Sequence, residues 1–436
     1  MRVVVVGGGL AGLFIGSELV SSGVDEAVVL EAGSEPGGIA RTTHFGGYSL
    51  EPGASSFNLP HPHLSPILER SSVEVDQALG TTRRHVYADG RLVGLASWSR
   101  ALSAPLLPFT AKLRALAEPL IPSREVPDET LGAFCRRRFG ARAGNLLAWL
   151  MATGVFAGDP ERLSMSAAFP AMARLEHEHG SILRGALRGR RARPSASRPW
   201  PHVPVGGMSR LADAVASSLG DRFRTGFPVV SVGSDDGVWV VEGPERLEAE
   251  VVVLAVRPEI AAGIVDDSLG RILSRATAAP VMVLGLGGEG PSPAPPGLGA
   301  LVGPDEELVT LGILFESSYA ADRAPSGSWL LKVIAGGATN SGFVGREEDD
   351  VVSTLVKEAT RILGSEVEPA FVQLVRHDQG IPQYHVGHRQ WLTAIEGELE
   401  GMPGLHVAGW GYRGVGVAGL ATDASRLARE IIHPCR

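Results

Sequence analysis

The clearest hydrophobic pattern lies at the start of the chain. Residues 2–6, RVVVV, form an unbroken run of β-branched residues, which is typical of a strand buried on both faces of a parallel sheet. Residues 10–20 carry apolar side chains at helical spacing, and Gly23 stands where a glycine ends a helix. A second apolar run, 26–31, ends in an acid. The pattern predicts a strand–helix–strand unit.

Similar patterns return far along the chain, in the order of one interrupted domain. The predicted elements are a turn with an amphipathic helix (203–220), a β-hairpin (227–243) with turn signals at 233–237, a buried strand (249–256), and a strand, glycine turn and helix at Leu405–Ala408, Gly409–Gly416 and Leu420–Ile431. We therefore expect one sheet to be assembled from distant segments.

The middle of the chain has a different pattern. Residues 128–152 and 161–187 have helical periodicity, and residues 99–122 are apolar with sparse cations and several prolines. Such segments are either buried helices of a bundle or helices that lie on a membrane surface. The arginine-rich run 184–199 lacks aromatic residues, which favours a solvated loop over a contact with anionic lipid.

Composition narrows the class of protein. A chain of 436 residues is expected to form two or three domains, and 44% hydrophobic with 20% charged residues suits a globular protein. The net charge of −8 argues against nucleic-acid binding. Cys135 and Cys435 form neither a disulfide framework nor a metal-ligand spacing, and we expect no metal. With a strand from residue 2 and no long apolar run, we expect neither a signal peptide nor a membrane span.

Three glycines between the first strand and helix carry the first chemistry. Gly7, Gly9 and Gly12 form the spacing GxGxxG. The first glycine allows a tight turn, the second lets the backbone approach a pyrophosphate, and the third packs helix on strand. The N–H groups at the helix start, where Leu10 and Ala11 stand, would face that anion.

An acid follows at the distance that this chemistry needs. Glu31, with Ala32 after it, ends the second apolar run, where a carboxylate binds the ribose hydroxyls of an adenosine. The glycine pattern alone is weak evidence, because glycines often only make turns. The full order of strand, glycines, helix, strand and acid predicts a bound dinucleotide, either NAD or FAD.

The next stretch favours FAD. Residues 35–57 contain the doublet Gly37-Gly38, Arg41, an alternating segment at Tyr48–Glu51, and a small-residue turn at Gly53–Ser56. This stretch resembles the flavoprotein oxidase superfamily that includes amine oxidases and protoporphyrinogen oxidases. The resemblance implies cofactor contacts from the two segments, namely Gly38, Arg41, Gly53, Ala54, Ser55 and Ser56.

Two later segments are expected to return to the cofactor. Val229 stands where the superfamily places a backbone contact to adenine, although it also suits a core strand. The C-terminal glycine turn leads into a second helix N-terminus, which would stabilise negative charge on a reduced flavin. The expected contacts there are Trp410, Val415, Gly416 and Val417.

Longer signatures narrow the resemblance. Residues 153–187, GIPQYHVGH (380–388) and GWGYRGVGV (409–417) are similar to those of the protoporphyrinogen oxidase family and of the coproporphyrinogen oxidases that share its fold. The resemblance implies a mixed α/β fold with three parts. They are a Rossmann-like FAD-binding domain (1–59, 203–258 and 398–436), a mixed-sheet substrate-binding domain (60–88 and 259–397) and a helical, membrane-facing insertion (89–202).

The resemblance also implies where substrate binds. Arg84 stands where an arginine pairs with a porphyrin propionate, Gly154 where a backbone faces the tetrapyrrole, and Leu301 where an apolar side chain contacts it. Ala320 replaces an aromatic residue that often stacks on a substrate ring. Two further departures are His377, where relatives carry Trp, and Ala418-Gly419, where Asn-Asp is common.

The implied activity is an oxygen-dependent FAD oxidase that converts protoporphyrinogen IX to protoporphyrin IX without a catalytic side chain. Oxidation of coproporphyrinogen III, or of another substrate such as an amine or carotenoid, is the alternative. A flavin-free binding protein like a GDP-dissociation inhibitor is opposed by the intact glycine motif. We expect a cytoplasmic monomer or homodimer, with a peripheral contact to the inner face of the membrane and no nucleic acid.

Overall fold

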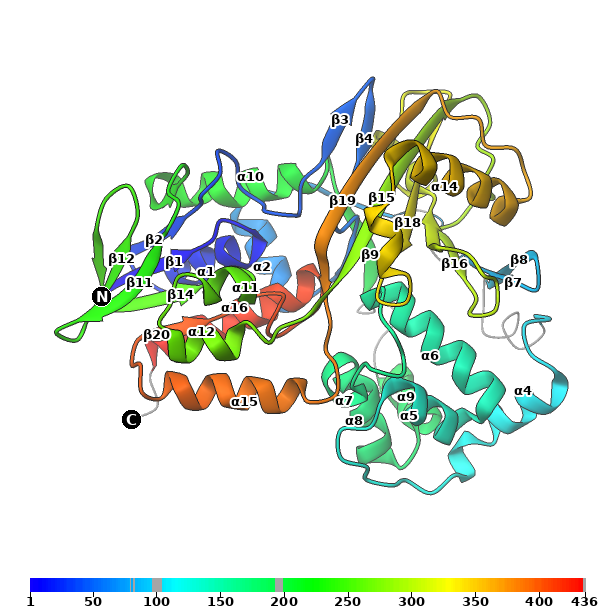
Figure 1. Cartoon of the computed structure of the whole chain (residues 1–436), viewed down its shortest axis with the longest axis horizontal. Coiled ribbons are helices and arrows are strands. Elements are labelled where there is room, and N and C mark those ends of the chain that lie inside the picture. Colours follow the sequence, from blue (N-terminus) through cyan, green and yellow to red (C-terminus); the bar gives the residue numbers. More distant parts are fainter. Residues whose placement is uncertain (79, 81–82, 96–103, 193–198, 434–436) are drawn as a thin grey trace.

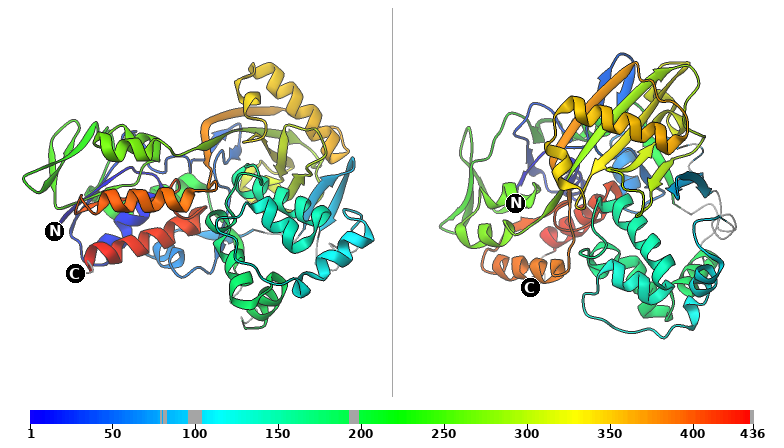
Figure 2. Two further views of the ribbon diagram at one scale, coloured as in Figure 1. Left: turned by 60° about the horizontal axis from the view of Figure 1, so that its bottom comes forward. Right: turned by 45° about the vertical axis from the view of Figure 1, so that its right-hand side comes forward.

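A computed structural model describes residues 1–78, 80, 83–95, 104–192 and 199–433. The molecule is elongated and has three parts (Figure 1). A parallel sheet with its helices lies near both termini, a mixed sheet lies at the other end, and a layer of helices packs beside the mixed sheet. Figure 2 shows the same separation of the helical layer from the termini in two further views.

The parallel sheet is assembled from distant segments, as its apolar runs predict. Its strand order is β10–β2–β1–β14–β20, and every neighbouring pair is parallel. The strands are β1 (Arg2–Val6), β2 (Glu26–Leu30), β10 (Phe223–Arg224), β14 (Val251–Leu254) and β20 (Leu405–Val407).

Both faces of this sheet are covered, which explains the unbroken valines of β1. Val3 and Val5 pack against a helical cluster on one face, and Val4 and Val6 against another cluster on the opposite face. The first face carries α1 (Leu10–Ser21), α2 (Leu64–Arg70), α10 (Met208–Leu219) and α16 (Val417–Ile432). The second carries α11 (Pro258–Ala262), α12 (Asp267–Leu273), α15 (His388–Leu399) and a three-stranded sheet of β11 (Ser231–Asp235), β12 (Val238–Glu242) and β13 (Leu247–Ala249).

The second large sheet is mixed. Its order is β19–β15–β18–β17–β16–β7–β8, with one parallel pair, β16 with β7, among the described strands. The strands are β7 (Arg84–Ala88), β8 (Arg91–Leu95), β15 (Ala278–Glu289), β16 (Gly299–Val302), β17 (Thr310–Leu314), β18 (Ser328–Gly336) and β19 (Phe371–Pro382). The amphipathic helix α14 (Glu348–Leu363) covers one face.

Short elements join these parts. They are the hairpin β3 (Thr43–Phe45) and β4 (Tyr48–Leu50), a three-stranded sheet of β5 (Phe57–Leu59), β6 (Val75–Gln77) and β9 (Trp200–Pro204), the helix α13 (Glu316–Tyr319), and the 3-10 turns η1 (Glu118–Leu120), η3 (Gly220–Arg222), η4 (Ala321–Arg323) and η5 (Ser341–Gly345).

The helical layer is divided more finely than its periodicity indicates. Gly140, at a φ of +82°, separates α5 from α6. The helices are α4 (Phe109–Leu116), α5 (Leu131–Phe139), α6 (Ala141–Phe156), α7 (Met165–Ala168), α8 (Pro170–His179) and α9 (Ile182–Ala192). Parts of the predicted segments 99–122 and 184–199 lie outside the described residues. No helix within the described ranges is long and apolar enough to cross a membrane.

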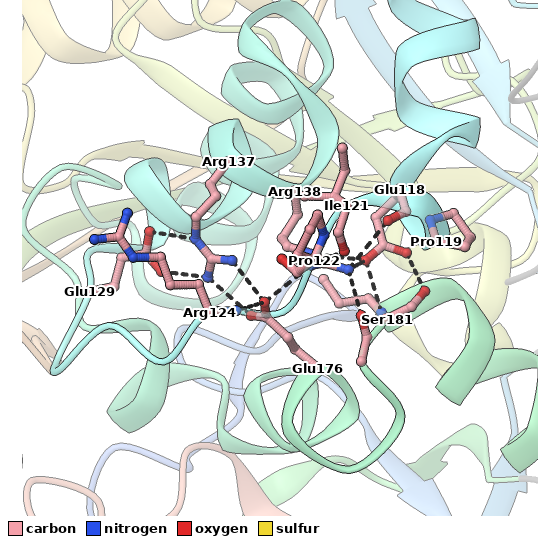
Figure 3. A network of polar contacts seen from close by, with 12 residues as sticks. Glu118, Pro119, Ile121, Pro122, Arg124, Glu129, Arg137, Arg138, Glu176 and Ser181 are labelled. Atoms are coloured by element: carbon pink, nitrogen blue, oxygen red, sulfur yellow. Dashed lines mark hydrogen bonds and ion pairs between the residues drawn. The ribbon is translucent and has the colours of Figure 1, made fainter.

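Buried charges hold this layer together (Figure 3). Arg138 is fully buried and pairs with Glu118, to which its Nε donates at 2.8 Å. Arg137 bridges Glu129 at 2.8 Å and Glu176 at 2.7 Å. Glu118 also accepts from the Ile182 amide at 3.1 Å, so its carboxylate caps the start of α9. Buried ion pairs as well as apolar packing therefore hold the helices of this layer together.

The mixed α/β fold is confirmed, and three details differ from expectation. Strand β8 pairs with β7, so the mixed sheet continues past residue 88 into the range expected to be helical. Helices α11, α12 and α15 pack on the parallel sheet, although the resemblance implies that residues 259–397 belong to the substrate-binding domain. Helix α16 begins at Val417 rather than Leu420, because Gly416 serves as its N-cap residue.

Candidate active site

The glycine motif forms a tight turn at the carboxyl end of β1. Gly7 has a φ of +112°, and a Cβ on Gly12 would overlap the Gly7 carbonyl oxygen, so both positions require glycine. Gly9 is different, since the nearest atom to an added Cβ is Gly37 O at 4.0 Å. Helix α1, starting at Leu10, has no side-chain cap, and Ala11 follows in its first turn. The turn therefore presents free N–H groups beside open space.

The acid at the end of β2 braces this turn. Glu31 accepts hydrogen bonds from the amides of Gly8 and Gly33, each at 2.8 Å. Ala32, between the acid and Gly33, is exposed. The Glu31 carboxylate thus lies directly beside the glycine turn, in the place predicted for a ribose contact.

The glycine doublet lies against the same turn. The Gly37 amide donates to Gly8 O at 2.8 Å, and a Cβ on Gly38 would be 3.3 Å from the Gly9 Cα. Arg41 is largely exposed, and its Nη1 lies 3.8 Å from a carboxylate oxygen of Glu35, which is also exposed.

The small-residue turn at 53–56 packs on the doublet segment. A Cβ on Gly53 would overlap Ile39 O, so glycine is required there. Ala54 is exposed, Ser56 is half-buried, and Ser55 is buried, with its hydroxyl donating to Glu316 Oε1 at 2.6 Å. Gly53 thus joins this turn to the doublet segment, whereas the Ser55 side chain is bonded in the interior.

Four buried charged residues lie beneath this turn, and the sequence interpretation missed them. They are Glu51, Glu316, Arg323 and Lys332. Arg323 Nη1 is 2.7 Å from Glu51 Oε1 in an ion pair, although the two groups are not aligned for a hydrogen bond. Burial raises the pKa of Glu51 to about 7, against the opposing effect of Arg323. A lone lysine within the apolar run SWLLKVIAG was the available signal.

The C-terminal glycine turn reaches the same region. An added Cβ on Gly409 would be 3.3 Å from the Ala11 Cβ, so this turn lies next to the start of α1. Gly416 is the uncapped N-cap residue of α16 and has open space around it, with Val415 before it and Val417 at the first helical position. Trp410 Nε1 is buried without a partner in the described structure.

Val229 lies just before β11 rather than within a strand, and it is half-buried. Its neighbour Phe227 donates its amide to Glu31 O at 2.8 Å, which fixes this segment beside the predicted ribose site. The Val229 amide has no acceptor within the described ranges, so it is available to a ligand.

The segment GIPQYHVGH is a junction between the three parts. The Tyr384 hydroxyl donates to Trp410 O at 2.7 Å, and the Ser164 amide donates to Tyr384 O at 2.8 Å. His388 Nε2 lies 3.0 Å from Tyr412 O, and its ring stacks on Tyr384 at 4.0 Å.

The other histidine of this segment also has a polar neighbour, since His385 Nδ1 lies 3.3 Å from the Thr277 hydroxyl. These histidines have structural contacts, and the described residues contain no group of three or more His, Cys, Asp or Glu suited to a metal.

Three of the four predicted substrate contacts lie near one another. Arg84 pairs with Gly299 on β16, two residues from Leu301, and a Cβ on Gly154 would be 3.1 Å from Leu301 Cδ1. The Arg84 guanidinium is exposed and has no ion-pair partner in the described part of the chain. Ala320 instead is buried in a small cluster with Tyr319 and Val203.

Two other positions that differ from the family pattern, His377 and Gly419, have explanations in their local contacts. His377 Nε2 lies 3.2 Å from Pro52 O, next to the small-residue turn, and burial lowers the pKa of its imidazole. At Gly419, an added Cβ would approach the Gly414 backbone to 2.8 Å. The close approach of these two glycines explains a small residue at 419.

The site fits FAD on its own geometry. Helices α1 and α16 pack in one cluster without side-chain caps, the glycine turn before α16 lies next to the start of α1, and Gly9 and Gly416 leave room where a side chain would intrude. Glu31 would hold the ribose, and the Leu10 and Ala11 amides the pyrophosphate. Trp410 Nε1 offers a donor that no described residue uses. The fold and this site define the protein as an FAD-dependent oxidoreductase.

The comparisons with known proteins agree. The chain belongs to the flavin-containing amine oxidoreductase family, whose model matches residues 10–432. It is 30% identical to the chloroplastic protoporphyrinogen oxidase of *Oryza sativa* subsp. *japonica*, over 98% of this chain and 87% of that protein. It is 23% identical to the coproporphyrinogen III oxidase of *Bacillus subtilis* (strain 168), over 95% and 94% of the two chains.

Its fold is similar to a crystal structure from *Exiguobacterium* sp. 255-15, of a protein assigned provisionally as a protoporphyrinogen oxidase. The TM-score is 0.83 at 22% identity, covering 99% of this chain and 98% of the other. At this identity, the likeness supports the fold alone.

Proposed function

We propose that this flavoenzyme oxidises protoporphyrinogen IX to protoporphyrin IX with molecular oxygen. The observation that carries the proposal is the similarity over nearly the whole chain to a plant protein named for this activity. Similarity of that extent includes the substrate-binding region as well as the cofactor-binding region. The Arg84 guanidinium, which has no ion-pair partner among the described residues, supports the proposal together with the nearby Gly154–Leu301 contact, because a carboxylated apolar ring needs both a cation and an apolar wall.

The chemistry asks little of the side chains. Bound FAD would supply the acceptor for hydride from a methylene bridge, and molecular oxygen would be the final electron acceptor, giving peroxide. Three such oxidations convert a porphyrinogen into the aromatic porphyrin, so three oxygen molecules give three peroxides. Arg84 would hold a propionate, and Gly154 with Leu301 would orient the ring. Aromatisation drives the reaction without a dedicated acid–base pair.

The direct test is aerobic turnover of purified holoenzyme with protoporphyrinogen IX. We expect growth of porphyrin fluorescence and about three peroxides per porphyrin formed, as three two-electron oxidations require. Coproporphyrinogen III is run in parallel. Faster turnover of coproporphyrinogen would assign that substrate instead, and turnover of neither would reject a porphyrinogen oxidase.

We also propose that the helical layer contacts the membrane surface. Phe109 on α4 is 73% exposed and Leu120 of η1 is 78% exposed, with Leu113 and Leu116 between them also exposed. Arg184 of α9 donates to Pro119 O at 2.7 Å, which places a cation beside Leu120. Exposed apolar residues next to cations suit an anionic lipid surface.

Flotation with vesicles of phosphatidylglycerol and phosphatidylcholine tests this contact. We expect the wild-type protein to float with the vesicles and the variant Phe109→Ser/Leu120→Ser to remain in solution with its FAD intact. Ile260→Ser is the control, because Ile260 is an exposed apolar residue on α11, away from the helical layer. Equal flotation of both variants would contradict the proposal.

A further inference from the structure

Lys332 is a buried cation on a central strand of the mixed sheet. It is 2% exposed, and its neighbours Leu331 and Val333 belong to the apolar core beneath α14. Since successive strand residues point to opposite faces, Lys332 points away from that core. Lysine is also rare in this protein. Of its 40 Lys and Arg residues, three are lysines, namely Lys112, Lys332 and Lys357. Burying an ammonium is costly unless it is paired and hydrogen-bonded.

The partners of Lys332 belong to the small-residue turn. Its Nζ donates to Gly53 O at 2.6 Å and to the Ser55 hydroxyl at 3.0 Å. The same hydroxyl donates to Glu316 Oε1 at 2.6 Å, so Ser55 links the cation to an anion. Burial lowers the pKa of Lys332, while Glu316 and Glu51 act in the opposite direction and Arg323 adds to the lowering.

Direct packing connects this lysine to the dinucleotide site. Gly53 rests on the Ile39 carbonyl, the neighbouring Gly38 lies against Gly9, and the Gly37 amide donates to Gly8 O at 2.8 Å. Lys332 therefore supports, from the substrate side, the stack of turns that forms the cofactor cradle. The charge is held in a dry interior, where it acts over a longer range than in water.

We propose that Lys332 is a positioning residue for the flavin, and that its charge favours flavin reduction. The inference rests on the proposed placement of turn 53–56 against the flavin. When a donor C–H bond breaks and its electron pair passes to the flavin as hydride, the donor is oxidised and the cofactor gains negative charge. A fixed nearby cation lowers the energy of that charge, and a fixed anion raises it. Lys332 and Glu316 should therefore act with opposite signs.

The opposite signs give a test that a purely structural role would not pass. The reduction potential of the bound flavin is measured anaerobically, with xanthine and xanthine oxidase as reductant and a reference dye. We expect Lys332→Gln, which retains donors but loses the charge, to make reduction at least tenfold less favourable, a decrease of about 30 mV for a two-electron couple. Glu316→Gln should shift the potential upward. Lys357→Gln, at an exposed lysine on α14, should leave it unchanged.

Shifts of the same sign in Lys332→Gln and Glu316→Gln, or no shift in either, would overturn the proposal. If Lys332→Gln does not retain FAD, two other variants test the proposal. It then requires a higher flavin potential in Glu316→Gln and an unchanged, wild-type potential in Lys332→Arg. An unchanged Glu316→Gln potential then overturns it. The assay contains no porphyrinogen, so a wild-type protein that oxidised none would reject the proposed function and leave this test valid.

Discussion

Two glycines of the dinucleotide turn have different surroundings and should respond differently to the same substitution. A Cβ on Gly12 would overlap the Gly7 carbonyl, whereas a Cβ on Gly9, at a φ of −68°, has 4.0 Å of clearance. We expect Gly12→Ala to destabilise the FAD-free protein by about 1–3 kcal/mol, as overpacking usually does. Gly9→Ala should leave that stability unchanged and weaken FAD binding about tenfold, since its methyl group enters the cofactor space.

Urea unfolding of the FAD-free variants and fluorescence titration with FAD measure these two effects separately. An unchanged FAD affinity in Gly9→Ala would show that the cofactor does not approach this turn.

Arg84 offers a second test at the residue scale. Its guanidinium is exposed and unpaired among the described residues, so it is free to pair with a carboxylate of the substrate. Replacing it by alanine should weaken porphyrinogen binding by about 1–3 kcal/mol, the scale of a lost charged hydrogen bond. FAD content should not change. Arg91→Ala on the paired strand β8 is the matched control, because Arg91 is also exposed. Equal KM values for the two variants would remove Arg84 from the substrate site.

At the scale of elements, local pattern predicts well where burial is uniform along the element. The valines of β1 and the glycine turn that follows fix a strand and a helix start within one residue of the observed bounds. The C-terminal helix began earlier than its apolar periodicity indicated, because the N-cap glycine at 416 is followed at once by helical Val417. The helical layer is predicted less well, because Gly140 divides into two helices a segment whose periodicity indicates one.

The buried pair of Arg138 and Glu118 supports this layer. Arg138→Met should destabilise the protein by about 3–5 kcal/mol, because it leaves the Glu118 carboxylate buried without its cation. Chemical unfolding measures the loss. Arg136→Met on the same helix is the control, since the ion pair of Arg136 with Glu161 is exposed and should contribute less than about 1 kcal/mol. Similar losses in both variants would contradict a special role for the buried pair.

Glu118 also predicts a pH dependence. Burial opposes ionisation, yet hydrogen bonds from Ser181, Arg138 and the amides of α9 lower the pKa of Glu118 below its usual value. A depressed carboxyl pKa stabilises the fold above the unfolded-state pKa of about 4.3, and this contribution is lost as the pH falls through the folded value. The stability gap between wild type and Glu118→Gln should be full at pH 7 and shrink below about pH 4. Urea unfolding of both proteins at neutral and at acidic pH measures this stability gap. A gap that did not change with pH would contradict the prediction.

At the scale of the whole molecule, the sequence predicted the cofactor-binding half better than the contacts between parts. Four of its five parallel strands lie in apolar runs that predict them, whereas the two-residue strand β10 (Phe223–Arg224) lies in no such run. No local pattern indicates that Glu51 pairs with Arg323, or that Lys332 holds Gly53, because each partner belongs to a different sheet or turn. The substrate residues came from resemblance, and their arrangement around a bound ring stays a prediction.

If the proposed function is right, a porphyrinogen reduces the FAD of this protein directly. Anaerobic mixing of holoenzyme with protoporphyrinogen IX in a stopped-flow spectrometer measures that step without oxygen. We expect loss of the flavin absorbance band together with the appearance of an oxidised porphyrin precursor. Flavin that stays oxidised with both protoporphyrinogen IX and coproporphyrinogen III, while a chemical reductant bleaches it, would show that this protein is no porphyrinogen oxidase.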